Sequence, residues 1–222
     1  MYSESTRDIA RDILQSNTAE RGYSAGATHF NDLWARDALY ACWGAIQHDM
    51  PGVEQTLESL QRAMKHGQVP LRIGRQNMVN VFLGLPTKEG PVYTNDKSDD
   101  PALDPNLLYT ITASKQILHD KTTFSTYKDS IHQALRWLRQ HRDDKGLLEE
   151  QPYASWDDAL KKQGVTAYTN ILYVAALRHA ADAVSDKAYE EQANRVEDAL
   201  INHLWEQPYF KAWEDRDVCD VA

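Results

Sequence analysis

Apolar residues along the chain recur at three- and four-residue steps, which is the spacing of amphipathic α-helices. Strand-like alternation of apolar and polar residues is nearly absent. The pattern predicts about seven helices and an all-α fold. The groups that carry it are Ile9 and Ile13; Leu39, Cys42, Trp43 and Ile46; Val53, Leu57, Leu60 and Met64; Leu107, Leu108, Ile111, Ile117 and Leu118; Ile131, Leu135 and Leu138; Ile171, Leu172, Val174, Ala175 and Leu177; and Val196, Leu200 and Leu204.

Short and long connections alternate between these predicted helices. Pro51, Thr122 and Asp186 follow very short breaks and are typical first or capping residues of a helix. Long segments rich in Gly, Pro, Asn and Asp lie at 16–33, 68–103 and 142–164, and another opens at 207. Antiparallel helices place successive connections at opposite ends, so we expect helical hairpins with all the long loops at one end. We interpret residues 1–222 as a single helical domain with its working face at that end.

The composition is that of a globular protein and narrows its partners. Of the 222 residues 42% are hydrophobic, and 24 basic against 33 acidic residues give a net charge of -9. No Lys/Arg cluster in the sequence could track phosphates, so we expect no nucleic-acid partner. The N-terminus lacks the order of a signal peptide, and no apolar run reaches the roughly 18 residues of a membrane span. A soluble cytoplasmic protein, or one whose leader was removed, is the expectation.

Cysteine and histidine usage predicts neither a metal site nor a cofactor. The two cysteines are Cys42, inside an apolar helical pattern, and Cys219, which give no disulfide framework. The eight histidines are scattered, without the spacing of metal ligands. A buried thiol is the expected state of Cys42.

The first candidate for chemistry lies where a long loop meets a helix, at Trp34, Arg36 and Asp37. An Arg beside an Asp can bind adjacent sugar hydroxyls, with the Trp ring as a stacking surface. The alternative is a structural ion pair with an Asp in the first turn, where the helix dipole favours it.

A second candidate is the acidic loop from Asp143 to Asp158. Glycoside hydrolysis needs one carboxylic acid to protonate the leaving oxygen and a second carboxylate to activate water or attack. Asp157, between Trp156 and Asp158, is placed for a raised pKa, and Tyr153 adds an aromatic ring. The alternative is a solvated loop with helix-capping carboxylates.

A third candidate is Asp104 before Pro105, at the end of the longest loop. This pair is a good N-cap followed by Pro at the first helical position. The same carboxylate could also contact a sugar, and the two uses are compatible.

The order of these segments resembles that of the glucoamylase, glycogen debranching enzyme and trehalase catalytic domains, which are (α/α)6 toroids of six helical hairpins. Trp34-Ala35-Arg36-Asp37 resembles their W-x-R-D sugar-binding segment. Ser155-Trp156-Asp157-Asp158 resembles the segment in which the first carboxylate after Trp is the general acid; the debranching pattern would move that role to Asp158. Residues 164–177 resemble the following helix, with Tyr168 and Asn170 as expected substrate contacts.

The resemblance implies an α-glucoside substrate and an inverting acid/base mechanism without a cofactor. These families take their base, a Glu, from the end of the barrel, and about seven helices fall short of the full twelve. We therefore expect an incomplete barrel, as a fragment, a split subunit or a naturally shortened relative, which a second chain or homo-oligomerisation could complete. Glu149, Glu150 and Glu214 are the candidate substitute bases. A non-catalytic carbohydrate-binding form of the barrel and an α-helical protein scaffold are the alternatives.

Overall fold

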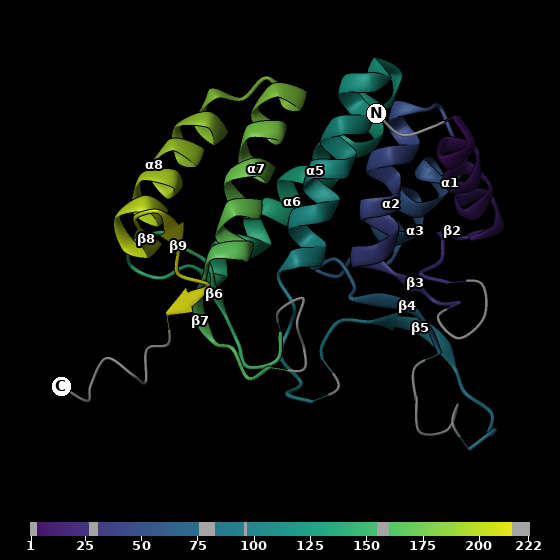
Figure 1. Ribbon diagram of the computed structural model, residues 1–222, viewed down its shortest axis with the longest axis horizontal. Helices are drawn as coiled ribbons and strands as arrows, with labels where there is room; N and C mark the ends of the chain where they lie inside the picture. Colours follow the sequence, from purple (N-terminus) through teal and green to yellow (C-terminus); the bar gives the residue numbers. More distant parts are fainter. Residues whose placement is uncertain (1–3, 27–30, 76–82, 96, 155–159, 215–222) are drawn as a thin grey trace. The chain divides into compact units, whose positions relative to one another are not determined.

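The computed structural model describes residues 4–26, 31–75, 83–95, 97–154 and 160–214, and these are mostly helical (Figure 1). The predicted all-α class with helical hairpins is therefore confirmed. The helices are α1 (Glu4–Ser16), α2 (Ala35–Gln47), α3 (Val53–Arg62), α5 (Asp104–His119), α6 (Phe124–Leu138), α7 (Ala167–Val184) and α8 (Lys187–Leu204), with 3-10 turns η1 (Lys121–Thr123) and η2 (Arg139–His141).

The segments between the helices contain short antiparallel strands, which the sequence pattern did not indicate. They are β1 (Thr18–Ala19) with β2 (Gly22–Tyr23); β3 (Leu33–Trp34), β4 (Arg72–Arg75) and β5 (Glu89–Val92) in the order β3-β4-β5; β6 (Glu149–Glu150), β7 (Gly164–Thr166) and β10 (Trp213–Glu214) in the order β10-β7-β6; and β8 (Trp205–Glu206) with β9 (Tyr209–Phe210). Most are two residues long, too short to show a period of two.

The chain divides into two compact units. Unit 1 comprises Met1–Met64 and Pro70–Val92, and unit 2 comprises Lys65–Val69 and Tyr93–Ala222. The interpretation of residues 1–222 as a single helical domain stays a prediction.

In unit 1, α2 and α3 pack on the β2 strand around a small apolar core. The Tyr23 hydroxyl donates to the Pro51 carbonyl at 2.5 Å, and the Tyr23 amide donates to Thr56 Oγ1 at 3.0 Å. Cys42 is fully buried there, and burial raises the pKa of its thiol to about 12. The expected buried thiol is therefore confirmed. Helix α3 begins at Val53, after Gly52, two residues beyond the predicted start at Pro51.

In unit 2, four helices form two hairpins, α5–α6 and α7–α8, and α7 packs against both α5 and α8. Most residues of α5 are buried. The hairpin turns are capped by aspartates: Asp120 accepts from the Thr122 amide, and Asp186 accepts from the Ala188 amide at 3.0 Å. The predicted cap at Asp186 is confirmed, whereas the cap expected at Thr122 belongs to Asp120.

The ends of these four helices carry different connections. The short turns after α5 and α7 lie at one end, and the long segments before α5, between α6 and α7 and after α8 lie at the other (Figure 1). The predicted gathering of long loops at one end is thus confirmed for unit 2.

A buried asparagine ties the turn at residues 65–68 to this bundle. Asn106 is fully buried in the first turn of α5; its Oδ1 accepts from the Val69 amide at 2.9 Å, and its Nδ2 donates to the Gly67 carbonyl at 2.7 Å. Gly67 has φ +89°, and a Cβ there would lie 2.5 Å from the Gln133 carbonyl oxygen, so only glycine fits the turn against α6.

In the described residues no helix is long and apolar enough to cross a membrane.

Two substitutions in α7 test this account of the core. Leu177 is fully buried, whereas Ile171 in the same helix is 47% exposed. We expect Leu177→Ala to lower the free energy of unfolding by about 2–5 kcal/mol, because it removes buried methyl groups and leaves a cavity. Ile171→Ala should cost less than about 1 kcal/mol. Urea unfolding measures both, and equal losses would contradict the packing of α7.

Candidate functional site

The long-loop end of unit 2 is organised by the three-stranded sheet β10-β7-β6. Glu149 and Glu214 both lie opposite Val165, one on each neighbouring strand. Residues paired in this way point to the same face of a sheet. Neighbouring strands are about 4.8 Å apart, so the two glutamates project from one face with their Cα atoms roughly 10 Å apart. The segment 151–163 joins β6 to β7 and is therefore held at both ends by the sheet.

Glu150 takes part in the internal structure of this end. It is 2% exposed, and its Oε1 accepts from the hydroxyl of Thr169, which is fully buried in α7. Thr166 caps α7, and its Oγ1 accepts from the Thr169 amide at 3.3 Å. A carboxylate is retained in such a buried position only with hydrogen bonds. Glu150 therefore joins β6 to the first turn of α7.

Asn170 fixes the strand that leads into the acidic loop. Its Oδ1 accepts from the Leu148 amide at 2.8 Å, and its Nδ2 donates to the carbonyls of Leu148 at 3.0 Å and Thr166 at 2.9 Å. The side chain is fully buried, and these bonds occupy both ends of its amide. Asn170 therefore positions the loop in this structure, and its expected contact with substrate stays a prediction.

The other expected substrate contacts of unit 2 lie at the starts of α5 and α7. Asp104 is 1% exposed and is the first residue of α5, with Leu103 before it as the cap residue, so the cap lies one residue earlier than predicted. Tyr168 is half-buried in the first turn of α7.

Tyr153 lies in the segment after β6 and is half-buried. Its φ is +60°, and its carbonyl accepts from Asn95 Nδ2 at 2.5 Å. The Lys97 ammonium lies 5.6 Å from the centre of its ring. A left-handed backbone is uncommon for an aromatic residue and persists only where its surroundings hold it. The Asn95 bond ties the segment before α5 to the segment before β7.

Trp156, Asp157 and Asp158, which include the expected general acid, lie outside the described residues. The residues on either side of them are described, because Ala154 is buried and Leu160 is exposed.

The remaining expected contacts lie in unit 1, at the junction of β3 with α2. Trp34 ends β3 and is half-buried, Arg36 is half-buried in the first turn of α2, and Asp37 is exposed there. The prediction that Arg36 and Asp37 open a helix is confirmed, and their binding of sugar stays a prediction.

A buried arginine that the sequence analysis did not single out lies beside Trp34. Arg72 pairs with Trp34 across β3 and β4, is 1% exposed, and its guanidinium carbon lies 5.4 Å from the centre of the Trp34 ring. Its Nη1 donates to Asp32 Oδ2 at 3.2 Å and to the Arg75 carbonyl at 2.5 Å.

The Asp32 carboxylate fills the space beside Gly74, where a Cβ would lie 2.0 Å from its Cγ. The Arg72 guanidinium therefore lies over one face of the Trp34 ring. Arg72 is one of two arginines in the short segment 70–75, and nothing in that segment signals such a role in the sequence.

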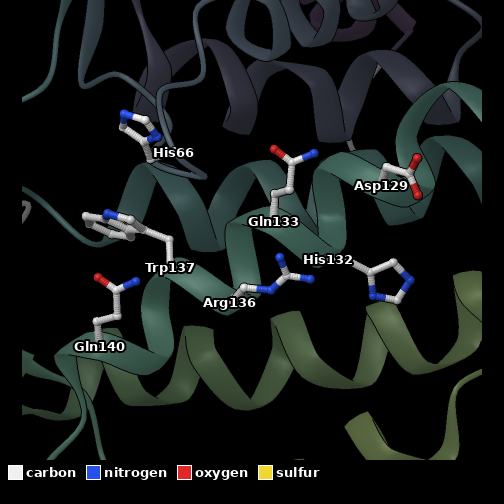
Figure 2. A pocket seen from close by; sticks show the side chains of 7 residues that line it. All are labelled: His66, Asp129, His132, Gln133, Arg136, Trp137 and Gln140. Atoms are coloured by element: carbon white, nitrogen blue, oxygen red, sulfur yellow. The ribbon is translucent and has the colours of Figure 1, made fainter.

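A separate pocket of about 530 Å³ lies along α6 (Figure 2). It is lined by one face of the helix, spaced at three- and four-residue steps, and by His66 from the turn at 65–68. The His132 ring is held by the Tyr189 hydroxyl, 2.6 Å from its Nδ1. None of the predicted sugar-binding residues lines this pocket. Its lining residues are His66, Asp129, His132, Gln133, Arg136, Trp137 and Gln140.

Comparison with known proteins gives a likeness of fold. No protein-family model matches the sequence, and no curated protein matches it. The structure is similar to the crystal structure of a GH78 family rhamnosidase of Bacillus sp. GL1, with a TM-score of 0.59 and 13% sequence identity.

The match covers 93% of this chain and 21% of the rhamnosidase, so the chain spans about a fifth of that protein's length. At this identity the likeness concerns the fold alone. The expected glycosidase-like fold is supported, without reaching the narrower glucoamylase, debranching enzyme and trehalase type.

The positioning role of Asn170 can be tested against a surface asparagine. Asn170→Ala leaves the Leu148 amide and two carbonyls without this partner, so we expect the free energy of unfolding to fall by about 2–3 kcal/mol. Amide hydrogen exchange at Leu148 should become faster. Asn194→Ala, which removes an exposed acceptor of Arg178, should cost less than about 0.5 kcal/mol. Unchanged amide hydrogen exchange at Leu148 in Asn170→Ala would refute the positioning role of Asn170.

Proposed function

We propose that this chain forms part of a glycosidase that acts on an α-glucoside by inversion, with Asp157 as the general acid. The observation that carries the proposal is that one loop of unit 2 begins and ends on paired strands of the same sheet. The segment 151–163, which contains Asp157, leaves β6 and returns to β7 in one small sheet, at the end where the long loops gather. A catalytic carboxylate needs such a rigid base, because small displacements lower the rate strongly.

The fold supports the same class of reaction. The structural likeness to a rhamnosidase is a likeness to a glycosidase, and the order of the sequence segments resembles other glycosidases. The choice of an α-glucoside and of inversion rests on that sequence resemblance alone. The proposed binding of sugar by Trp34, Arg36 and Asp37 of unit 1 rests on the same sequence resemblance.

Among the three glutamates considered as a base, the geometry favours Glu149 and Glu214 over Glu150. Glu150 is 2% exposed and is bonded to Thr169, so water has little access to it. Glu149 is half-buried, and Glu214 Oε2 lies 3.3 Å from His203 Nε2. Inversion requires acid and base carboxyls about 6.5–9.5 Å apart, with water between them. Either of these two glutamates would have to meet that distance from Asp157.

Non-catalytic carbohydrate binding is the second candidate function. It is favoured by the internal hydrogen bond of Glu150 with Thr169, which occupies one of the carboxylates considered as a base. This candidate keeps the sugar contacts and needs no second carboxylate.

The decisive measurement is release of reducing sugar from a panel of α-glucosides by the purified chain. We expect Asp157→Asn to reduce turnover by about 10²–10⁴-fold, because it removes the proton donor, while sugar binding stays nearly intact. Asp144→Asn removes the same charge from the same acidic region and should leave turnover unchanged.

Full activity in Asp157→Asn would sink the assignment, and loss in Asp158→Asn alone would move the role to Asp158. Saturable sugar binding without turnover on any substrate would favour the second candidate. Where turnover is found, Glu149→Gln and Glu214→Gln identify the base.

A further inference from the structure

A second pocket of unit 2, of about 350 Å³, is surrounded by positive charge. It lies between η2, the turn at 143–146 and the first half of α8. Among its lining residues in the described chain none is acidic. Its cationic members are Arg139, Arg142, Lys145 and Arg195. On a chain with a net charge of -9, four cations around one small pocket are an unusual local concentration.

Two of these cations are available to a ligand. Within the described residues Arg139 and Arg195 form neither an ion pair nor a side-chain hydrogen bond. Lys145 Nζ lies 3.1 Å from His203 Nδ1, which leaves two of its three donors unused by that bond. Arg142 forms a side-chain hydrogen bond with Tyr173, and the charges of Arg142 and Arg139 counteract the rise that burial causes in the pKa of that hydroxyl.

The acidic residues nearest in sequence do not neutralise the pocket. Asp143 Oδ1 accepts from the Lys145 amide at 3.0 Å and from the Leu147 amide at 2.8 Å, so its carboxylate stabilises its own turn. Asp144 is exposed, and neither it nor Glu191 or Asp198 lines the pocket. The turn therefore presents Lys145 to the pocket and keeps Asp143 bonded to backbone.

The floor and walls leave room for more than a single ion. Gln192 and Val196 are buried at the base, and the Gln192 amide is held by the Tyr173 hydroxyl. Ala188 and Gly146 are small, and a Cβ at Gly146 would meet no atom within 4 Å. A volume of about 350 Å³ falls in the range of small-molecule sites.

We propose that this pocket binds a small ligand through a phosphate group. Three guanidinium groups and an ammonium supply many converging donors, and the forked geometry of Arg matches the oxygens of phosphate. A phosphate monoester carries up to two negative charges, which offset the mutual repulsion of the four cations better than one carboxylate does. The cations surround a pocket and do not form a stripe along the surface, so a small molecule fits better than a nucleic-acid backbone.

Calorimetric titration of the whole chain tests the proposal, with inorganic phosphate, glucose 6-phosphate and glucose as probes at constant ionic strength. We expect saturable binding of at least one phosphate probe and none of glucose. The double variant Arg139→Gln/Arg195→Gln should weaken phosphate binding by roughly tenfold or more, because it removes two charge-assisted contacts. Lys128→Gln, which removes a cation of α6 that lines neither pocket, should bind as the wild type does.

Each outcome decides the matter. Equal affinity for the two phosphate probes would support a site for inorganic phosphate, and tighter binding of glucose 6-phosphate would support a sugar phosphate. The proposal fails if neither phosphate probe binds, if glucose binds as tightly as glucose 6-phosphate, if the double variant binds like wild type, or if a single-stranded oligonucleotide binds more tightly than either phosphate probe. Far-ultraviolet circular dichroism of the double variant checks its fold. None of these results depends on glycosidase activity.

Discussion

The long-loop end of unit 2 depends on two buried asparagines that hold incoming chain segments against helices. Asn106 in α5 bonds to the backbone at Gly67 and Val69, and Asn170 in α7 bonds to the backbone at Leu148. Both lie in the first turn of a helix and are fully buried. An amide can donate and accept at once, so each acts as a short piece of strand pairing where the chain has no strand. Without such bonds, buried loop backbone would carry a large desolvation cost.

Buried hydrogen-bonded residues hold the candidate site in place, and other residues would act on a ligand. Two buried contacts set where β6 and β7 lie. Thr169 donates to Glu150, and Asn170 donates to the carbonyl of Leu148. Asp157, the proposed general acid, belongs to the segment that follows β6 in the sequence. In unit 1, Arg72 has the corresponding place beneath Trp34. In the proposed function the loop residues would carry the chemistry, and the helix termini would hold them in place.

Sequence periodicity predicted the helices and the gathering of long loops because both arise from local spacing and chain direction. The Asp186 cap followed from residue type and position alone. The strands were not predicted, since two-residue elements have no period, and Asn170 was interpreted as a sugar contact because nothing local indicates its bonds to Leu148. Arg72 and the grouping of Arg139 with Arg195 depend on residues far apart in sequence. The resemblance of short motifs supplied the class of chemistry, which geometry alone does not give.

Asn106 and Asn170, each with its bonds to the backbone of an incoming segment, act as two clamps. These clamps also bear on how such a protein can be re-engineered. Each clamp fixes the base of a loop independently of the loop's outer part, so the outer part can be lengthened, shortened or exchanged at a small entropic cost. An insertion between Leu148 and Glu149 would instead shift the register of β6 and break the clamp. Grafting of foreign loops is therefore best attempted in segment 151–163, and the four residues before it are best left intact.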